Sequence, residues 1–367
     1  MTEAINATDT DRNTASETGA ETGRGAEPPT AGAEAGAAGG SGRSRRTVLR
    51  AAVAGAGAVA SMGAATTAAV AASTEGAAGR RRHRSASPTF VLVHGSGSNS
   101  YGWSPLVGEL ALRGHRAVAV DLPGHGPGAY FPLSYQAPQD VERLSTEPSP
   151  LGKVTLADFA EHVTGVVRRA HRNGPVVLVG QSMGGATLNA VANQVPELLA
   201  HLVYASAFCP AKTATVMQLM LSTEGLTSVL LRLTGVPTPR ELGVNRVNWR
   251  SNDPGFFRTA KEALAGGYPD DEVRALLNIL EPDESAAVAD ADARGLPERW
   301  GRVPRTFLRF TEDRAIPLAL QDRMIREADE LTPGNRFRVR SLAAPHIGPR
   351  DPALLADELE RVARLCS

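Results

Sequence analysis

The stretch Val179-Gly180-Gln181-Ser182-Met183-Gly184-Gly185 decides how this chain can fold, because it joins an apolar strand pattern to a helical one. Residues 175–179 before it are apolar, and residues 184–194 continue with helical spacing. Glycines two positions before and after the serine permit a turn too tight for side chains at those places. The serine is thereby pushed clear of the backbone, at the head of a helix whose amides can meet an anion. The pattern predicts a nucleophile at Ser182; the alternative is an ordinary glycine-rich turn.

A nucleophilic serine needs a base, because its hydroxyl is inert at its own pKa. Two histidines follow Ser182: His201 at the start of a predicted strand, and His346 between the last predicted strand and the last helix. His201 would lie at the opposite edge of the sheet, so elimination leaves His346 as the base. The alternative for His346, a hydrogen-bonded loop histidine, would leave Ser182 without a partner.

The acid that orients the histidine is expected after the preceding strand, on a loop that reaches the imidazole. Two neighbouring carboxylates, Glu312 and Asp313, meet this condition, and we choose Asp313. The alternative is a plain acidic turn at this position, with the third catalytic residue elsewhere, for instance Glu281 or Asp283.

The oxyanion that develops during acyl transfer needs two backbone amides already aimed at it. One is the N–H of Met183, directly after the nucleophile. The other should come from the loop His94-Gly95-Ser96-Gly97, where Ser96 is the candidate. We expect His94 to tie this loop down rather than to act as a second base. Neither a Walker lysine nor a dinucleotide fingerprint accompanies the glycines, so phosphate binding is not indicated.

Strand and helix patterns alternate from residue 88 onward, which predicts an α/β fold with a mostly parallel sheet and helices on both faces. We expect strands at 89–93, 116–120, 175–179, 201–206, 305–310 and 336–341. The first two are predicted to be buried. The expected helices are 103–113, 154–172, 184–194, 318–328 and 352–365. Ligands collect at the carboxyl ends of such strands, so chemistry should lie there.

Two segments break the alternation. Residues 121–152 are rich in proline and contain aromatic residues, which suggests a long ordered loop. Residues 208–300 are too long for one crossover and carry helical patterns at 215–233, 254–265 and 271–280. We expect this block to form a helical lid over the active edge of the sheet; the alternative is an insertion remote from the site.

Composition limits the partners. Acidic and basic residues number 39 each, so net charge gives no reason to expect nucleic acid or an anionic membrane as partner. An apolar fraction of 42% excludes a wholly disordered chain. Cys209 and Cys366 cannot supply a disulfide framework or a multi-cysteine zinc site. They could form one bridge in an oxidising compartment, but we favour free thiols.

The N-terminal region is predicted to be an export signal rather than part of the fold. Residues 1–43 contain few large apolar side chains and cannot fold alone. The pair Arg45-Arg46, followed by the weakly apolar, uncharged stretch 51–72, resembles a twin-arginine signal peptide. We therefore expect recognition by the twin-arginine export machinery, cleavage near residue 72 and a secreted product. The alternative is a transmembrane anchor, which the many Ala and Gly residues disfavour.

Five motifs together resemble the α/β-hydrolase superfamily across residues 88–367. They are HGSGSNSYGW (94–103), AVDLPGHG (119–126), GQSMGG (180–185), TEDRAIP (311–317) and APHIG (344–348). The chain is most similar to the branch with plant methylesterases, hydroxynitrile lyases and bacterial pyrethroid-type carboxylesterases. The resemblance implies Ser182 as nucleophile, His346 as base and Asp313 as orienting acid, with Ser96 and Met183 as oxyanion amides. It also implies a helical cap after the strand 201–206 and no cofactor.

Departures from the family patterns narrow the chemistry. Hydroxynitrile lyases of this branch place a lysine beside the catalytic histidine, where this chain has Ile347, so lyase chemistry is disfavoured. Serine at position 182 disfavours epoxide hydrolases and haloalkane dehalogenases, which use aspartate there. The expected organisation is a signal at 1–72, a linker at 73–87, a hydrolase core at 88–207 and 301–367, and a lid at 208–300.

The predicted function is hydrolysis of a moderately hydrophobic carboxylic ester or lactone through an acyl-enzyme. An apolar lid over a nucleophile favours such a small-molecule substrate. Apolar residues cluster early in the lid: Met217, Leu219, Met220, Leu221, Val229, Leu230 and Leu231. For any one of them, packing within the lid is the simpler role. An acyltransferase or perhydrolase would use the same three residues, and a ligand-binding protein could share the scaffold without catalysis.

Overall fold

Six parallel strands form the central sheet, in the order β2-β1-β3-β4-β7-β8. The strands are β1 (Thr89–Val93), β2 (Arg116–Val120), β3 (Val176–Ser182), β4 (His201–Ala207), β7 (Arg305–Phe310) and β8 (Arg338–Leu342). This computed structural model describes residues 87–366, so the predicted export signal and all but the last residue of the predicted linker lie outside the described residues. Within that described part, no helix is both long and apolar enough to cross a bilayer.

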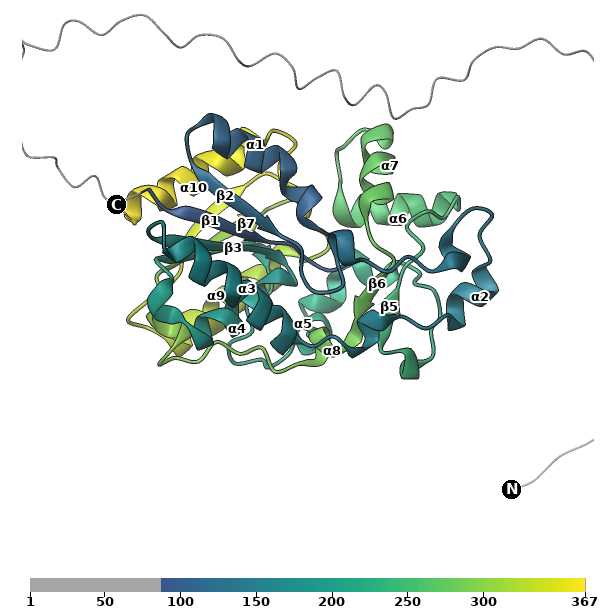
Figure 1. Ribbon diagram of the computed structural model, residues 1–367, viewed down its shortest axis with the longest axis horizontal. Helices are drawn as coiled ribbons and strands as arrows, with labels where there is room; N and C mark the ends of the chain where they lie inside the picture. Colours follow the sequence, from purple (N-terminus) through teal and green to yellow (C-terminus); the bar gives the residue numbers. More distant parts are fainter. Residues whose placement is uncertain (1–86, 367) are drawn as a thin grey trace, which may run out of the picture. The chain divides into compact units, whose positions relative to one another are not determined.

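Helices pack on both faces of the sheet, as Figure 1 shows. One face carries α1 (Ser104–Leu112) and α10 (Pro352–Leu365); the other carries α3 (Leu156–His171), α4 (Gly184–Gln194) and α9 (Leu318–Leu331). Successive strand residues alternate between the two cores: Phe90 and Leu92 join one cluster, Val91 and Val93 the other. Side chains on a strand point alternately to its two faces, so an all-apolar strand requires cover on both. The predicted fold class is confirmed.

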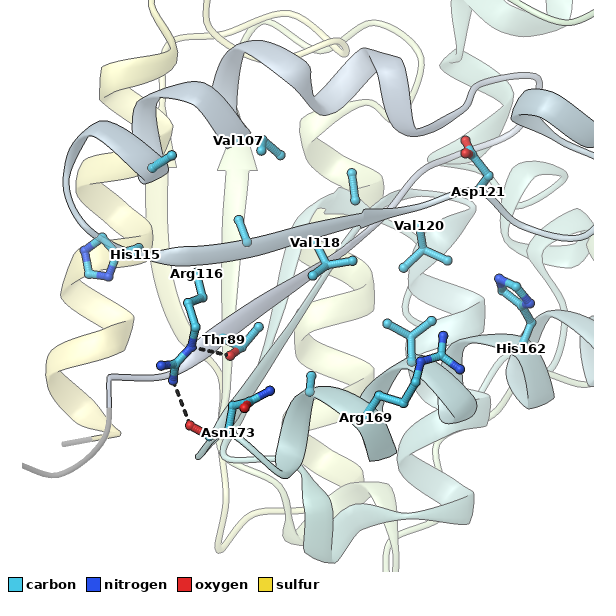
Figure 2. Close-up of a pocket in the computed structure, with 15 residues that line it drawn as sticks. Thr89, Val107, His115, Arg116, Val118, Val120, Asp121, His162, Arg169 and Asn173 are labelled. Carbon is cyan, nitrogen blue, oxygen red and sulfur yellow. Dashed lines mark hydrogen bonds between the residues drawn. The ribbon is translucent and has the colours of Figure 1, made fainter. Parts of the chain in front are cut away.

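The predicted burial of strand 116–120 is wrong. β2 is the edge strand of the sheet, and Val118 is 43% exposed. Beside β2 lies a groove of about 800 Å³, bordered by α1 and α3 (Figure 2). Figure 2 shows the Arg116 side chain across its lower end, bonded to Thr89 and to the carbonyl of Asn173. None of the predicted site residues lines this groove.

The segment 121–152 is not a plain loop. It contains the short helix α2 (Val141–Thr146) and three 3₁₀ turns. Asp140 caps α2 by accepting from the amide of Arg143 at 2.9 Å. Six residues are too few to display helical periodicity, so the prediction of a loop without elements was wrong at this point.

The segment 208–300 is mixed rather than purely helical. It contains α5 (Val216–Met220), α6 (Pro254–Leu264), α7 (Asp270–Ile279) and α8 (Ala286–Asp290). It also contains a two-stranded antiparallel sheet of β5 (Val244–Arg246) and β6 (Asp283–Ser285), which we did not predict because three-residue strands carry no readable pattern. Some of its apolar side chains form a separate core cluster around Trp249, Phe256 and Leu277, and others, such as Leu219 and Val288, belong to the core on the sheet. This segment is called the cap below.

The predicted helix over 215–233 is wrong beyond residue 220. After α5 the chain makes two 3₁₀ turns, at Gly225–Thr227 and Val229–Arg232. Gly225 packs so closely on the carbonyls of Leu219 and Met220 that a side chain would not fit. The Ser228 hydroxyl donates to the carbonyl of Ala315 and thereby draws the backbone out of a helical path.

Gly185 tests how closely α4 packs on the sheet, and Gly108, on an open face of α1, is the control. A Cβ at Gly185 would overlap the carbonyl oxygen of Phe208, whereas nothing lies within 4 Å of a Cβ at Gly108 in α1. We expect G185A to lower the free energy of unfolding by about 1–3 kcal/mol through overpacking. G108A should raise it by up to about 1 kcal/mol, because alanine favours helix. Denaturant unfolding measures both, and equal changes would contradict the packing argument.

Candidate active site

Ser182 lies at the end of β3 in a backbone conformation that few residues adopt. Its φ is 51°, in the left-handed region, and it shares this feature with Ser206 among the non-glycine residues 87–366. Such a conformation costs on the order of 1–3 kcal/mol and persists only where packing enforces it. Packing does so here: a Cβ at Gly95 would come within 2.6 Å of the Ser182 Cβ, and one at Gly184 within 2.6 Å of the His94 carbonyl. The bend is therefore clamped against the end of β1.

Asp313 and His346 form a buried acid–histidine pair at the carboxyl edge of the sheet. Asp313 Oδ2 lies 2.7 Å from His346 Nδ1, and both side chains are buried. Asp313 Oδ1 accepts from the amides of Ala315 and Ile316 at 2.7 and 2.8 Å, and the Ser206 hydroxyl donates to Oδ2 at 2.5 Å. These bonds fix the carboxylate in one orientation. With Nδ1 engaged, Nε2 of His346 is the nitrogen left for proton transfer.

The structure brings the His346 loop against the strand that carries Ser182. The side-chain amide of Gln181, the residue before Ser182, donates to the His346 carbonyl at 2.5 Å. Within residues 87–366, the Ser182 hydroxyl makes no hydrogen bond to the imidazole. A hydrogen bond between a catalytic hydroxyl and its base is often long without substrate and tightens only in the substrate complex.

The alternative acids have other environments. Glu312 is exposed, and its backbone amide bonds to the carbonyl of Ala344. Glu281 and Asp283 are buried in the cap, but Glu281 is bound to His125 and Asp283 to Arg246, and neither is bound to His346. Of the four carboxylates considered from the sequence, the structure places only Asp313 at the imidazole.

The two histidines that were considered as a base and rejected, His94 and His201, are bonded to groups other than Ser182. His94 Nε2 accepts from the Leu122 amide at 3.1 Å, so its Nδ1 carries the proton and donates to the Gly95 carbonyl at 2.8 Å. Burial, with the nearby His125, lowers the pKa of His94 to about 4 and keeps it neutral. His201 contacts the Thr306 hydroxyl at 2.9 Å. Both observations agree with the expectation that neither is the base.

The two predicted oxyanion amides flank Ser182. Met183 follows it directly, at the start of α4, and Ser96 follows Gly95, which contacts the serine. Neither the Met183 nor the Ser96 amide donates a hydrogen bond to another group within the described residues. Both N–H groups are thus available to an incoming oxygen.

A buried charged cluster under the loop 94–97 was not predicted. His125 Nδ1 lies 2.7 Å from Glu281 Oε2, and His125 Nε2 lies 3.6 Å from Glu284 Oε1, an ion-pair distance too long for a hydrogen bond. The second oxygen of Glu284 accepts from the Gly97 amide at 3.0 Å. We refer to His125, Glu281 and Glu284 as the buried cluster. No spacing in the sequence pairs position 125 with positions 281 and 284.

Within residues 87–366, no group of three or more histidine, cysteine, aspartate or glutamate side chains is arranged to hold a metal ion. Cys209 and Cys366 are free thiols. Burial raises the pKa of Cys209 to about 12, so this thiol is a poor nucleophile.

Comparison with known proteins places these features in a family. Residues 90–358 match the family described as "Alpha/beta hydrolase family". The chain is 25% identical over 244 residues to the pyrethroid hydrolase of Sphingobium wenxiniae, covering 65% of this chain and 75% of that protein. It is 29% identical over 245 residues to methylesterase 1 of Arabidopsis thaliana, covering 64% and 82%.

A solved structure of similar fold is the novel pyrethroid hydrolase from Sphingobium faniae JZ-2, at 24% identity and a TM-score of 0.59. That match covers 76% of this chain and 97% of the other. The matched residues 90–358 include strands from β1 to β8. They also include Ser182, Asp313 and His346. This chain belongs to the alpha/beta hydrolase family.

Proposed function

We propose that this protein is a serine esterase that cleaves a carboxylic ester through an acyl-enzyme intermediate. The observation that carries the proposal is the fixed Asp313–His346 pair, at 2.7 Å, beside the strained bend that presents Ser182. The relatives support ester chemistry, because those at 25% and 29% identity are a pyrethroid hydrolase and a methylesterase.

The proposed mechanism assigns one step to each group. Ser182 Oγ attacks the ester carbonyl carbon while His346 Nε2 takes its proton, and Asp313 stabilises the imidazolium. The amides of Ser96 and Met183 donate to the oxyanion of the tetrahedral intermediate. The intermediate expels the alcohol, which receives the proton from His346. Water, deprotonated by His346, then attacks the acyl-enzyme, and the acid is released as Ser182 recovers its proton.

The cap supports a moderately hydrophobic ester or lactone as substrate. Leu219, Met220 and Val229 are buried in the apolar cores, which agrees with a packing role. Leu221 and Leu231, by contrast, are 58% and 45% exposed. Exposed apolar side chains on a cap favour apolar ligands over strongly charged ones.

Replacing the nucleophile tests the proposal directly. We expect S182A to lower kcat/KM for aryl esters by about 10⁴-fold or more, because no other group can form the acyl-enzyme. A fluorophosphonate should label the wild-type protein and not S182A. The control is S104A, at an exposed serine in α1. Undiminished turnover in S182A would refute the assignment, and a wild-type protein that resists labelling would favour a ligand-binding role.

Substitutions at two neighbouring carboxylates, Asp313 and Glu312, test which of them orients His346. We expect D313N to lower kcat by about 10⁴-fold, because the amide can hold His346 in the wrong tautomer. The control E312Q removes the adjacent, exposed carboxylate and should change kcat by less than about twofold. Steady-state kinetics on one aryl ester decides between them, and a larger loss in E312Q would reverse the assignment. The same assay with lactones in place of the ester tests the acyl donor, and product analysis with added alcohol or peroxide identifies the preferred acyl acceptor.

A further inference from the structure

The cap holds the loop 94–97 by both backbone groups of Gly97. The Gly97 amide donates to Glu284 Oε2 at 3.0 Å, and its carbonyl accepts from the Glu281 amide at 2.8 Å. Gly97 has a φ of 59°, and a Cβ there would come within 3.1 Å of the Glu281 carbonyl oxygen. The residue directly before it is Ser96, the candidate oxyanion amide. The N–H of the Ser96–Gly97 peptide therefore donates to a carboxylate of the cap.

The buried cluster joins three segments that are distant in sequence. Glu281 and Glu284 come from the cap, and His125 comes from the loop after β2. Glu281 Oε1 accepts from the Gly126 amide at 2.8 Å and from the Asn99 side chain at 2.9 Å. All three residues of the cluster are at least 94% buried. The loops that follow β1 and β2 thus meet the cap through one set of polar contacts.

Such a cluster contributes little net free energy to the stability of a fold. Burying ionised groups costs several kcal/mol each, and well-packed apolar residues often stabilise equally well. Burial alone would raise the pKa of Glu284, but its contacts with His125 and the Gly97 amide outweigh burial and lower it. Glu284 is therefore an anion at neutral pH, and a carboxylate binds a backbone amide about twice as strongly as a neutral acceptor does.

We propose that Glu284 is a positioning residue of the esterase, which acts through Gly97 to aim the Ser96 amide at the oxyanion. His125 supports it by holding the carboxylate in place, and the Glu281 amide fixes the next peptide along by donating to the Gly97 carbonyl. The inference rests on the function proposed above, because it needs an oxyanion to be stabilised.

The consequence for catalysis is selective. The oxyanion exists in the transition state and not in the bound ester, so a displaced amide weakens transition-state binding alone. Complete loss of one oxyanion donor costs about 10²–10³-fold in kcat. A donor that is displaced rather than removed should cost less.

The test is E284Q, which keeps the shape and removes the charge. Glu284 accepts from the amides of both Gly97 and Ser285, one on each oxygen, and glutamine has one acceptor oxygen for the two. We expect kcat for an aryl ester to fall about 10- to 100-fold, with KM changed less than about threefold. The matched control is D283N, which disturbs an equally buried carboxylate of β6 that binds Arg246 and not the loop 94–97.

The control separates positioning from general damage to the cap. D283N should lower the midpoint of thermal unfolding yet leave kcat of the folded protein within about threefold of wild type. The proposal is overturned if folded E284Q retains wild-type kcat, if its loss falls on KM, or if D283N loses kcat equally. If the wild type neither turns over esters nor reacts with a fluorophosphonate, the proposed function fails instead.

The pH profile gives a second readout. Burial opposes the charge on His125, but Glu281 and Glu284 more than offset it and raise its pKa from 6.5 to about 9. Two other titratable groups are close: His94, edge-on at 5.0 Å between ring centroids and neutral, and Asp121, whose carboxylate contacts Gly126. Because its pKa is raised, His125 is charged and its ion pair with Glu284 is complete below pH 6.5. That contribution is lost as pH rises through about 9.

We therefore expect wild-type kcat to fall above pH of about 9, because neutral His125 no longer holds Glu284. In E284Q one of the two carboxylates that raise the His125 pKa is gone, so any remaining fall should begin at lower pH. An alkaline limb at the same pH in both proteins would contradict the link between the cluster and the Ser96 amide.

Discussion

The bend at Ser182 is the constraint on which the arrangement of the sheet edge depends. A left-handed serine between β3 and α4 can exist only if neighbouring backbones approach it without side chains. Gly184 packs against carbonyls at the end of β1, and Gly185 packs against Phe208, just after β4. The ends of three adjacent strands are thereby drawn to one point. The loops that follow β1, β3 and β4 therefore start close to Ser182, which is why distant parts of the chain meet there.

The parts of this arrangement that could be predicted are those written in local patterns. Apolar runs between turn residues gave β1, β2 and β7 to the residue, and chain order led to Asp313 and His346. The exposure of β2 could not be foreseen, because an edge strand and a central strand can have the same apolar sequence. α2, β5 and β6 are too short to show a period. Glu281 was considered only as a catalytic acid, since its pairing with His125 depends on how the cap folds back.

The cap and the segment 121–152 form one structural unit through buried charges. Arg246 on β5 binds Asp283 of β6 at 2.5 and 2.8 Å, and its guanidinium also donates to the carbonyls of Leu144 and Glu147. His125 makes a parallel connection a short distance along the same segment. Buried ion pairs of this kind add little net stability but are costly to break, so they specify one arrangement of the two segments. The cap is stabilised by its own apolar cluster and by apolar residues that pack into the core on the sheet, and the buried charges help to set its position.

The two halves of the proposed catalytic machinery differ in which groups of the molecule hold them. The Asp313 carboxylate and the His346 carbonyl are bonded by groups of the core, namely Ser206 at the end of β4, Gln181 on β3 and the amides that follow β7. The cap touches only the backbone beside them, where Leu264 accepts from the Ile347 amide and Ser228 donates to the Ala315 carbonyl. Gly97, next to the Ser96 amide, is held by the cap. In the proposed mechanism the core therefore generates the nucleophile, while the cap contributes to stabilising the charge that the nucleophile creates. A substitution that reshapes the cap for a new ester acts on two quantities at once, the fit of the substrate and the aim of the amide. That coupling limits which cap sequences combine with an unchanged core, because a cap that binds a substrate well must also bring a carboxylate to Gly97.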